Sequence, residues 1–252
     1  MRRILIKVAY DGTDFHGWQL QPGVRTVESE LNAAIKALTE EEIAVTGASR
    51  TDAGVHSMGN VAVFDTESTI PADRFCPALN TYLPEDVKVT ESFEVKPDFH
   101  PRKVNCRKTY EYRILCSRVP DPLRRRNTWQ IPYALDVGKM QEAAKYLIGE
   151  HDFASFCCVR TQAESTVRTI FDIEVTGKDN TAASKEITIR VTGNGFLYNM
   201  VRIIAGTLVE VGAGKKEPEW VKEALEKADR TEGGPTAPPQ GLVLKEIIYL
   251  EK

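Results

Sequence analysis

The chain lacks any apolar run near the roughly 20 residues that a membrane-spanning helix requires. Its N-terminal segment has Ile4, Ile6 and Val8 at a spacing of two, and no small-residue cleavage site follows them. This pattern is typical of a first strand and not of an export signal. We therefore expect a soluble protein that works in the cytoplasm and has no membrane partner.

Clustered metal ligands and cofactor motifs are also lacking. The five cysteines include no C-x-x-C pair, and the four histidines lie far apart in the sequence. Zinc sites need clustered soft ligands, and an odd number of cysteines without an export signal favours free thiols. No G-x-G-x-x-G motif follows a strand, and the Gly-Ala-Gly-Lys-Lys segment at 212–216 lacks the spacing of a phosphate-binding loop. The sequence therefore predicts no metal site and no cofactor.

A basic excess is missing as well, since the net charge of the 252 residues is −3. The distribution of charge is uneven: residues 100–127 contain nine lysines or arginines and two acids, whereas residues 40–98 are acidic. Phosphates dominate the affinity of proteins for nucleic acids, so a local basic segment can bind RNA where the total charge does not favour it. Two interpretations of this segment stay open: a solvated surface, or a phosphate-facing loop at Arg124–Arg126.

Apolar periodicity predicts an α+β fold with two similar halves, residues 1–100 and 101–252. The first half has expected strands at 2–10, 43–48, 60–65 and 86–95, and expected helices at 27–38, with Thr26 as N-cap, and after Pro71. The second half has expected strands at 105–116, 167–176, 186–192 and 242–248, expected helices at 137–148, 197–211 and 217–227, and an exposed hairpin loop at 177–184. Mainly antiparallel strands from both halves would form a continuous sheet with helices packed on one face.

Asp52 lies in the segment GASRTDAGVH, where a predicted buried strand ends and the chain turns. Ala53 and Gly54 follow it and are small enough for a substrate to approach the carboxylate. An Asp before Ala-Gly is commonly only a turn. Arg50, two positions earlier, favours a functional site, because an acid in a dry pocket stays ionised only beside a cation.

Three further segments contain candidate binding residues. Tyr110 and Tyr112 share one face of an expected strand; this pattern is typical of a core, but the interleaved basic residues also suit the stacking of unpaired bases. Arg202 lies in a mostly apolar helix and needs a partner, for which Asp52 is the obvious candidate. Leu242 follows a proline-constrained turn, and its pattern alone indicates an ordinary core leucine.

Seven sequence blocks occur in an order that resembles the tRNA pseudouridine synthase A family. They are FHGWQ (15–19), SRTDAGVHSMGNVAVF (49–64), FHPR (99–102), RKTYEYRI (107–114), GEHDFASF (149–156), GFLYNMVRIIAGTL (195–208) and APPQGL (237–242). The resemblance extends along essentially the whole chain, and seven blocks in sequence are highly specific. It implies a fold with a central RNA-binding cleft.

The resemblance implies a role for five residues. The aspartate of the R-T-D-A-G-V-H block, here Asp52, is the essential catalytic group. The arginine before T-D, here Arg50, helps to flip the nucleotide and fills its place, and the tyrosine of R-K-T-Y, here Tyr110, lies against the target base. The arginine of M-V-R, here Arg202, pairs with the catalytic carboxylate, and the leucine after Q-G, here Leu242, lines the pocket.

Four positions depart from the family pattern. Ser49 stands where a glycine is common, Asn60 where a glutamine is common, and Pro101 and Pro239 where alanines are common. None is a catalytic position, so these departures bear on the geometry of the loops and not on the implied activity.

The implied activity is the isomerisation of uridine to pseudouridine at positions 38 to 40 of the anticodon stem-loop of tRNA, by a homodimer. The N1–C1′ bond breaks, the base turns, and C5 is joined to C1′, so the reaction is redox-neutral and needs no cofactor. Asp52 acts either as nucleophile or as the base that removes a sugar proton. Two rival functions are a non-catalytic RNA-binding module and an aspartate-nucleophile hydrolase or phosphotransferase, a class that generally requires Mg²⁺ held by further carboxylates.

Overall fold

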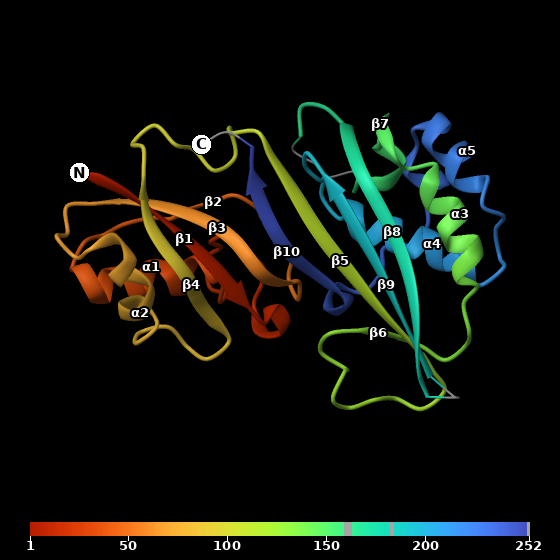
Figure 1. Ribbon diagram of the computed structural model, residues 1–252, viewed down its shortest axis with the longest axis horizontal. Helices are drawn as coiled ribbons and strands as arrows, with labels where there is room; N and C mark the ends of the chain where they lie inside the picture. The colour runs from red at the N-terminus through yellow and green to blue at the C-terminus, as the bar shows by residue number, and fades with distance from the viewer. Residues whose placement is uncertain (159–162, 182–183, 251–252) are drawn as a thin grey trace. The chain divides into compact units, whose positions relative to one another are not determined.

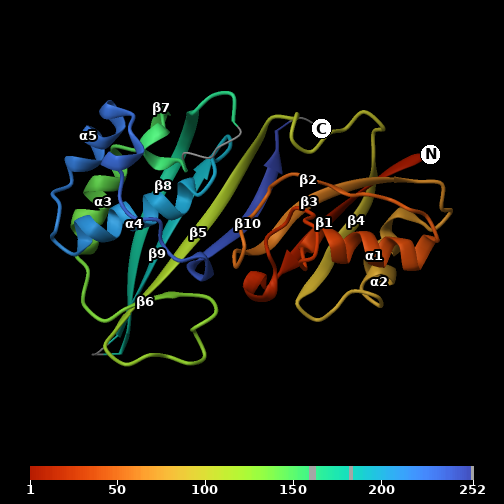
Figure 2. The same cartoon turned by 180° about the vertical axis from the view of Figure 1, so that it is seen from behind.

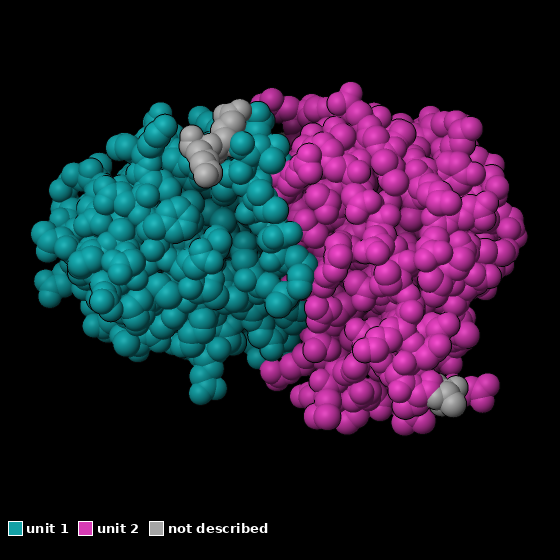
Figure 3. Space-filling model, viewed as in Figure 1, with its two compact units in different colours: residues 1–106, 244–252 teal, residues 107–243 magenta. Residues whose placement is uncertain are grey.

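The computed structural model describes residues 1–158, 163–181 and 184–250. The chain forms two compact units, which Figure 3 shows in two colours. Unit 1 comprises Met1–Cys106 and Leu244–Lys252, and unit 2 comprises Arg107–Val243. Each unit combines mostly antiparallel strands with helices, as Figure 1 shows, so the predicted α+β class is confirmed.

The strands of unit 1 follow the spatial order β4–β1–β3–β10. Their bounds are Arg2–Tyr10 for β1, His56–Thr66 for β3, Val87–Val95 for β4 and Leu242–Tyr249 for β10, and the short β2 (Thr46–Gly47) pairs with β3. β1 pairs antiparallel with both β3 and β4. Most of β10 therefore completes the sheet of the unit that begins the chain, although unit 2 separates the two segments in sequence.

Two helices, α1 (Val27–Thr39) and α2 (Phe75–Leu79), pack on the sheet of unit 1 (Figure 2). The predicted N-cap Thr26 is confirmed: its side chain accepts a hydrogen bond from the Ser29 backbone N–H, and Ser29 reciprocates. Apolar positions of α1 such as Leu31 and Ile35 are buried against the alternate residues of β1, which include Ile4 and Ile6. The spacing of apolar residues in the sequence therefore decides which faces meet.

The strands of unit 2 follow the spatial order β5–β9–β8–β7, and β6 pairs with β5 in parallel. Their bounds are Cys106–Ser117 for β5, Trp129–Ile131 for β6, Gly149–Asp152 for β7, Val167–Thr181 for β8 and Ser184–Gly193 for β9. The helices are α3 (Val137–Lys145), α4 (Met200–Gly212) and α5 (Trp220–Lys227). Helix α3 packs on β8 and on α4, where Gly212 leaves room for the side chain of Met140.

Two strands of unit 1 differ from their predicted lengths. The predicted strand at 43–48 is reduced to β2, because the backbone N–H of Val45 donates to the side-chain oxygen of Asn32 (3.0 Å) and not to a neighbouring strand. The predicted strand at 60–65 is longer than expected and covers His56–Thr66, because β1 offers partners along almost its whole length. The lengths of β2 and β3 are set by pairing with neighbouring segments, and the local sequence pattern holds no information on that pairing.

Two predictions for unit 2 were wrong at element ends. Residues 182 and 183 of the hairpin loop predicted at 177–184 lie outside the described residues, and Gly177, Lys178 and Asp179 belong to β8 and pair with residues of β9. Helix α4 begins at Met200 and not at 197, because Asn199 has a left-handed backbone with φ of 63°. A left-handed residue cannot continue a right-handed helix toward its N-terminus.

Candidate active site

Asp52 lies in the turn between β2 and β3 of unit 1. Its backbone carbonyl accepts a hydrogen bond from the N–H of Val55 (3.2 Å), and Gly54 has a left-handed φ of 77° that glycine adopts without strain. The Asp52 side chain is half-buried, whereas Arg50 and Ala53 are exposed. The predicted tight turn is confirmed, and it holds a carboxylate that is partly open to solvent beside small residues.

The segment Phe15–Trp18 braces this turn from one side. The backbone N–H of Trp18 donates to the carbonyl of Thr51 (3.0 Å), and the N–H of Gly54 donates to the carbonyl of Phe15 (3.3 Å). Gly17 has φ of 88°, and a Cβ atom there would lie 2.8 Å from the Thr51 carbonyl oxygen. Only glycine therefore allows the two segments to approach so closely.

Buried polar side chains brace the turn from the other side. The Tyr10 hydroxyl shares a 2.7 Å hydrogen bond with the hydroxyl of Thr51. The side-chain amide of Asn60 donates to the Ser49 carbonyl (2.9 Å) and accepts from the Ser49 N–H (3.2 Å). The two departures of this region from the family pattern, Ser49 and Asn60, are thus hydrogen-bonded to each other.

Sequence reasoning assigned no function to Tyr10 or Asn60. The sequence did contain a signal for both residues. Tyr10 follows the alternating apolar residues Ile6 and Val8 in β1, and Asn60 precedes Ala62 on the same face of β3, so each brings a polar group into an apolar row. A buried polar side chain in such a row needs hydrogen-bond partners, and here these partners are the residues next to Asp52 and Arg50.

Tyr110 and Tyr112 of unit 2 lie on the same face of β5, as their spacing predicts, and both are buried. The Tyr110 ring packs edge-on against Phe196, with ring centroids 5.2 Å apart, and 8% of the residue is exposed. Tyr112 is fully buried and donates its hydroxyl to the carbonyl of Pro238 (2.7 Å), and burial raises its pKa well above the usual value. Tyr112 therefore belongs to the core, whereas Tyr110 keeps a small exposed surface.

Arg202 of helix α4 has hydrogen-bond partners within unit 2. Its Nε donates to the carbonyl of Ala237 and its Nη1 donates to the side-chain oxygen of Asn199, both at 2.8 Å. The left-handed backbone of Asn199 places this amide at the start of the helix, one turn before Arg202. These two contacts, which the sequence does not indicate, orient the guanidinium; its pairing with Asp52 stays a prediction.

Leu242 begins β10, directly after the short 3₁₀ turn at Pro239–Gly241. The side chain is 6% exposed. Gly241 lies against the ring of Tyr112, where a Cβ atom would be 2.6 Å from Cζ. The predicted proline-constrained turn before a strand is confirmed.

The basic loop at Arg124–Arg126 is only partly available to a ligand. Arg124 forms an ion pair with Glu186 of β9 and lies 3.8 Å from the Asp121 carboxylate. Arg125 and Arg126 are exposed. Arg124 therefore holds the loop onto β9, and Arg125 donates a hydrogen bond to the carbonyl of Pro122 within the loop (3.0 Å).

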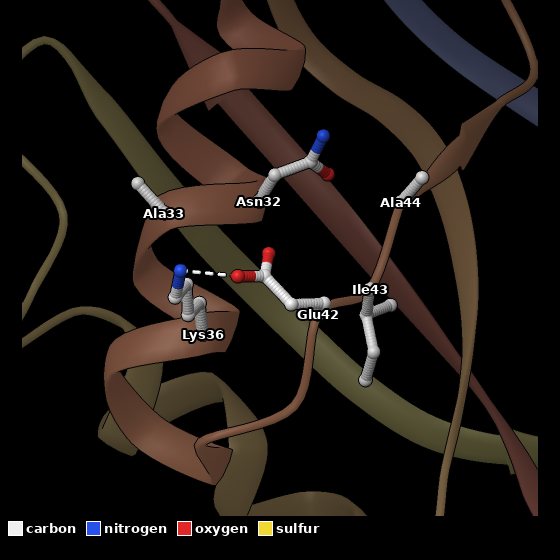
Figure 4. Close-up of a pocket in the computed structure, with 6 residues that line it drawn as sticks. All are labelled: Asn32, Ala33, Lys36, Glu42, Ile43 and Ala44. Carbon is white, nitrogen blue, oxygen red and sulfur yellow. Dashed lines mark hydrogen bonds and ion pairs between the residues drawn. The ribbon is translucent and has the colours of Figure 1, made fainter.

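A surface pocket of about 400 Å³ in unit 1 is shown in Figure 4. It lies between α1 and the segment before β2 and is lined by Asn32, Ala33, Lys36, Glu42, Ile43 and Ala44. Its cation, Lys36, forms an ion pair with Glu42. This pocket shares no residue with the candidate site.

Metal ligands do not cluster in the part of the chain that the structure describes. Residues 1–158, 163–181 and 184–250 contain no group of three or more His, Cys, Asp or Glu side chains that could hold a metal ion. No helix within these same ranges is long and apolar enough to cross a membrane.

Comparison with known proteins identifies the family. The family model described as tRNA pseudouridine synthase matches residues 6–102 and 143–250, which include Asp52, Arg202 and Leu242. The tRNA pseudouridine synthase A of Thermoanaerobacter sp. (strain X514) is 46% identical over 249 residues, which cover 99% of this chain and 100% of that protein. The proteins of the same name from Acetivibrio thermocellus and Halalkalibacterium halodurans are 45% and 47% identical, over 99% and 96% of this chain and 100% and 91% of theirs. The chain therefore belongs to the tRNA pseudouridine synthase family, whose members are isomerases.

Proposed function

We propose that this protein isomerises uridine to pseudouridine at positions 38 to 40 of the anticodon stem-loop of tRNA, with Asp52 as the catalytic carboxylate. The observation that carries the proposal is the Asp52 turn, a half-buried carboxylate between two sets of hydrogen bonds and beside small residues. Membership of the family supports the reaction, and relatives named tRNA pseudouridine synthase A along their full length support the substrate.

The reaction requires little chemistry beyond one ionised carboxylate. The N1–C1′ bond breaks, the base rotates, a C5–C1′ bond forms, and the proton lost from C5 is balanced by one gained at N1. Asp52 serves either as the nucleophile at the sugar or as the base that takes a sugar proton. In both cases the carboxylate must be held in one orientation toward the extruded nucleotide.

The remaining candidate residues bind the nucleotide in this proposal. Arg50, exposed beside the Asp52 turn, fills the place of the flipped base. Tyr110 lies against the base, and its edge-on contact with Phe196 supports a fixed ring. Arg202 pairs with Asp52, and Leu242 lines the pocket; the bonds of Arg202 to Asn199 and Ala237 support a guanidinium of defined direction.

We assign contacts with the phosphates of the tRNA stem to the exposed cations of the basic loop, Arg125 and Arg126. Phosphate contacts fix the register of a protein on a nucleic acid without reading its bases. We place the enzyme in the cytoplasm as a homodimer, in which two subunits cradle one tRNA.

The test is to incubate purified protein with an unmodified, uridine-labelled tRNA transcript and to analyse the nucleosides after complete digestion. We expect pseudouridine at one or more of positions 38 to 40, and none in a transcript with cytidine at these positions. Binding without conversion would favour the non-catalytic RNA-binding module, and release of free uracil or phosphate would favour a hydrolase.

A further inference from the structure

We infer that Tyr10 and Asn60 are positioning residues, which hold the backbone on both sides of Arg50 and so fix the direction of the Asp52 carboxylate. The inference rests on the proposed function, because it names the residues that prepare the catalytic turn for the reaction. Neither side chain is placed against the substrate; each acts through Ser49 or Thr51.

Asn60 is fully buried, and all the hydrogen-bonding capacity of its amide is in use. The amide Nδ2 donates to the Ser49 carbonyl (2.9 Å) and to the Tyr10 hydroxyl (3.4 Å). The amide Oδ1 accepts from the Ser49 N–H (3.2 Å) and the Val61 N–H (2.9 Å). The Asn60 amide thus bonds both backbone groups of Ser49, as a neighbouring strand would. Ser49 is therefore held in place although it lies outside β2 and β3.

Tyr10 connects this amide to the residue before Asp52. Its hydroxyl lies 2.7 Å from the Thr51 hydroxyl, and both residues are buried. Its ring packs against Phe15 and Trp18, with centroid distances of 6.4 and 6.0 Å. Because Trp18 also donates to the Thr51 carbonyl, Thr51 is held through its side chain and its backbone at once.

Burial of the Asn60 amide costs free energy of desolvation, which argues for a role of this residue beyond packing. The neighbours of Asn60 on the same face of β3, Ala62 and Phe64, are apolar, and an apolar residue at 60 would avoid the desolvation of an amide. A displacement of about 1 Å of a reacting group can lower a rate by about 100-fold. A bonded network that restricts Ser49 and Thr51 limits such displacements at Asp52.

The decisive variant is Tyr10→Phe, which removes one hydroxyl and keeps the ring. Its matched control is Tyr249→Phe in the same unit, where the hydroxyl donates to the Pro101 carbonyl (3.0 Å) and the ring packs edge-on against Phe99. We measure the single-turnover rate of pseudouridine formation with enzyme in excess, the dissociation constant for tRNA, and the melting temperature.

We expect Tyr10→Phe to lower the single-turnover rate about 10- to 100-fold with tRNA affinity unchanged within about twofold. Tyr249→Phe should keep the full rate, and the two variants should have similar melting temperatures. Equal rates in the two variants would overturn the inference, as would a Tyr10→Phe rate that falls only in proportion to the folded fraction. An inactive wild-type protein would instead refute the proposed function.

A second variant, Asn60→Gln, tests the Asn60 amide by size. It lengthens the side chain by one methylene at a fully buried site, so the amide can no longer meet both backbone groups of Ser49. We expect a loss of rate with unchanged tRNA affinity. An Asn60→Gln protein with the wild-type rate contradicts the role of Asn60.

Discussion

The Asp52 turn of unit 1 and the basic loop of unit 2 both connect strands and both carry charged residues, but they are held in opposite ways. Around Asp52, residues Ser49, Thr51 and Val55 are buried, and hydrogen bonds reach Ser49 and Thr51 from three other segments of the unit. In the basic loop, Leu123 is 90% exposed, and the connection to the rest of unit 2 includes the surface ion pair between Arg124 and Glu186.

In the proposed function the turn and the loop have different roles, catalysis and phosphate binding. A reacting carboxylate must lie within a fraction of an ångström of its productive position, which only a buried framework secures. A contact with a phosphate tolerates movement, because Coulomb attraction varies gently with distance and the ligand is large. We therefore expect changes in the turn to affect the rate and changes in the loop to affect affinity.

The largest expected effect is that of Asp52→Asn, which keeps the size of the side chain and removes its charge. The rate of pseudouridine formation should fall by on the order of 10³-fold or more, because the missing carboxylate can neither attack the sugar nor take its proton. Binding of tRNA, measured on filters, should survive. A purified Asp52→Asn protein that still forms pseudouridine at a measurable rate would remove Asp52 from its assigned role.

Next in size is the effect of Tyr110, a well-buried candidate residue of unit 2. Tyr110→Ala should lower the single-turnover rate about 100-fold and weaken tRNA binding only slightly, because one stacked base is a small part of the total contact. Tyr110→Phe keeps the ring and removes the hydroxyl. A retained rate in this variant would show that Tyr110 acts by stacking and not through its hydroxyl. If alanine weakens binding as much as it lowers the rate, Tyr110 belongs with the affinity residues.

A smaller effect is expected for the basic loop, and the exposure of its arginines indicates which of them to change. The double variant Arg125→Gln with Arg126→Gln should weaken binding to every tRNA alike and flatten the log–log dependence of affinity on salt by about 0.7 to 0.9 for each phosphate that the protein no longer neutralises. The rate at saturating tRNA should barely change. Arg124→Gln serves as the matched control, since Arg124 is paired with Glu186 of β9 and is less exposed than Arg125 and Arg126. An unaltered salt slope in the double variant would show that these arginines are a solvated surface.

No change at all is expected on removal of divalent metal ions. The isomerisation has no redox or hydrolytic step, so excess chelator should leave the rate intact when monovalent salt keeps the tRNA folded. The folding of the tRNA is followed separately by its melting curve. Activity that disappears with the tRNA still folded, and returns with Mg²⁺ alone, would favour the hydrolase.

The sequence predicts the features that local pattern controls. Apolar spacing found the faces of β1 and α1, the capping residue Thr26 marked a helix start, and small residues marked the turn at Asp52. Each of these depends on neighbours within a few positions along the chain.

What the sequence could not predict depends on partners far along the chain. Tyr10 and Asn60 are 50 positions apart, and Arg202 meets a carbonyl oxygen of Ala237, 35 positions away. Any residue type has a backbone carbonyl, so the identity of Ala237 gives no signal. The lengths of β2 and β8 also differ from the predicted strands at 43–48 and 167–176, since strand lengths are set by the neighbouring strand.

The division of unit 1 in the sequence has a consequence for how the protein is made. Residues 1–106 leave the ribosome before the 137 residues of unit 2, yet most of β10, the strand beside β3, is synthesised after all of them. Strand β3 supplies Asn60 to the turn at Asp52. On the edge of β3 away from β1, β2 pairs only with Ala62 and Val63, so during translation most of the rest of this edge stays unpaired until β10 is made. The nascent chain therefore completes unit 1 last, although it begins that unit first.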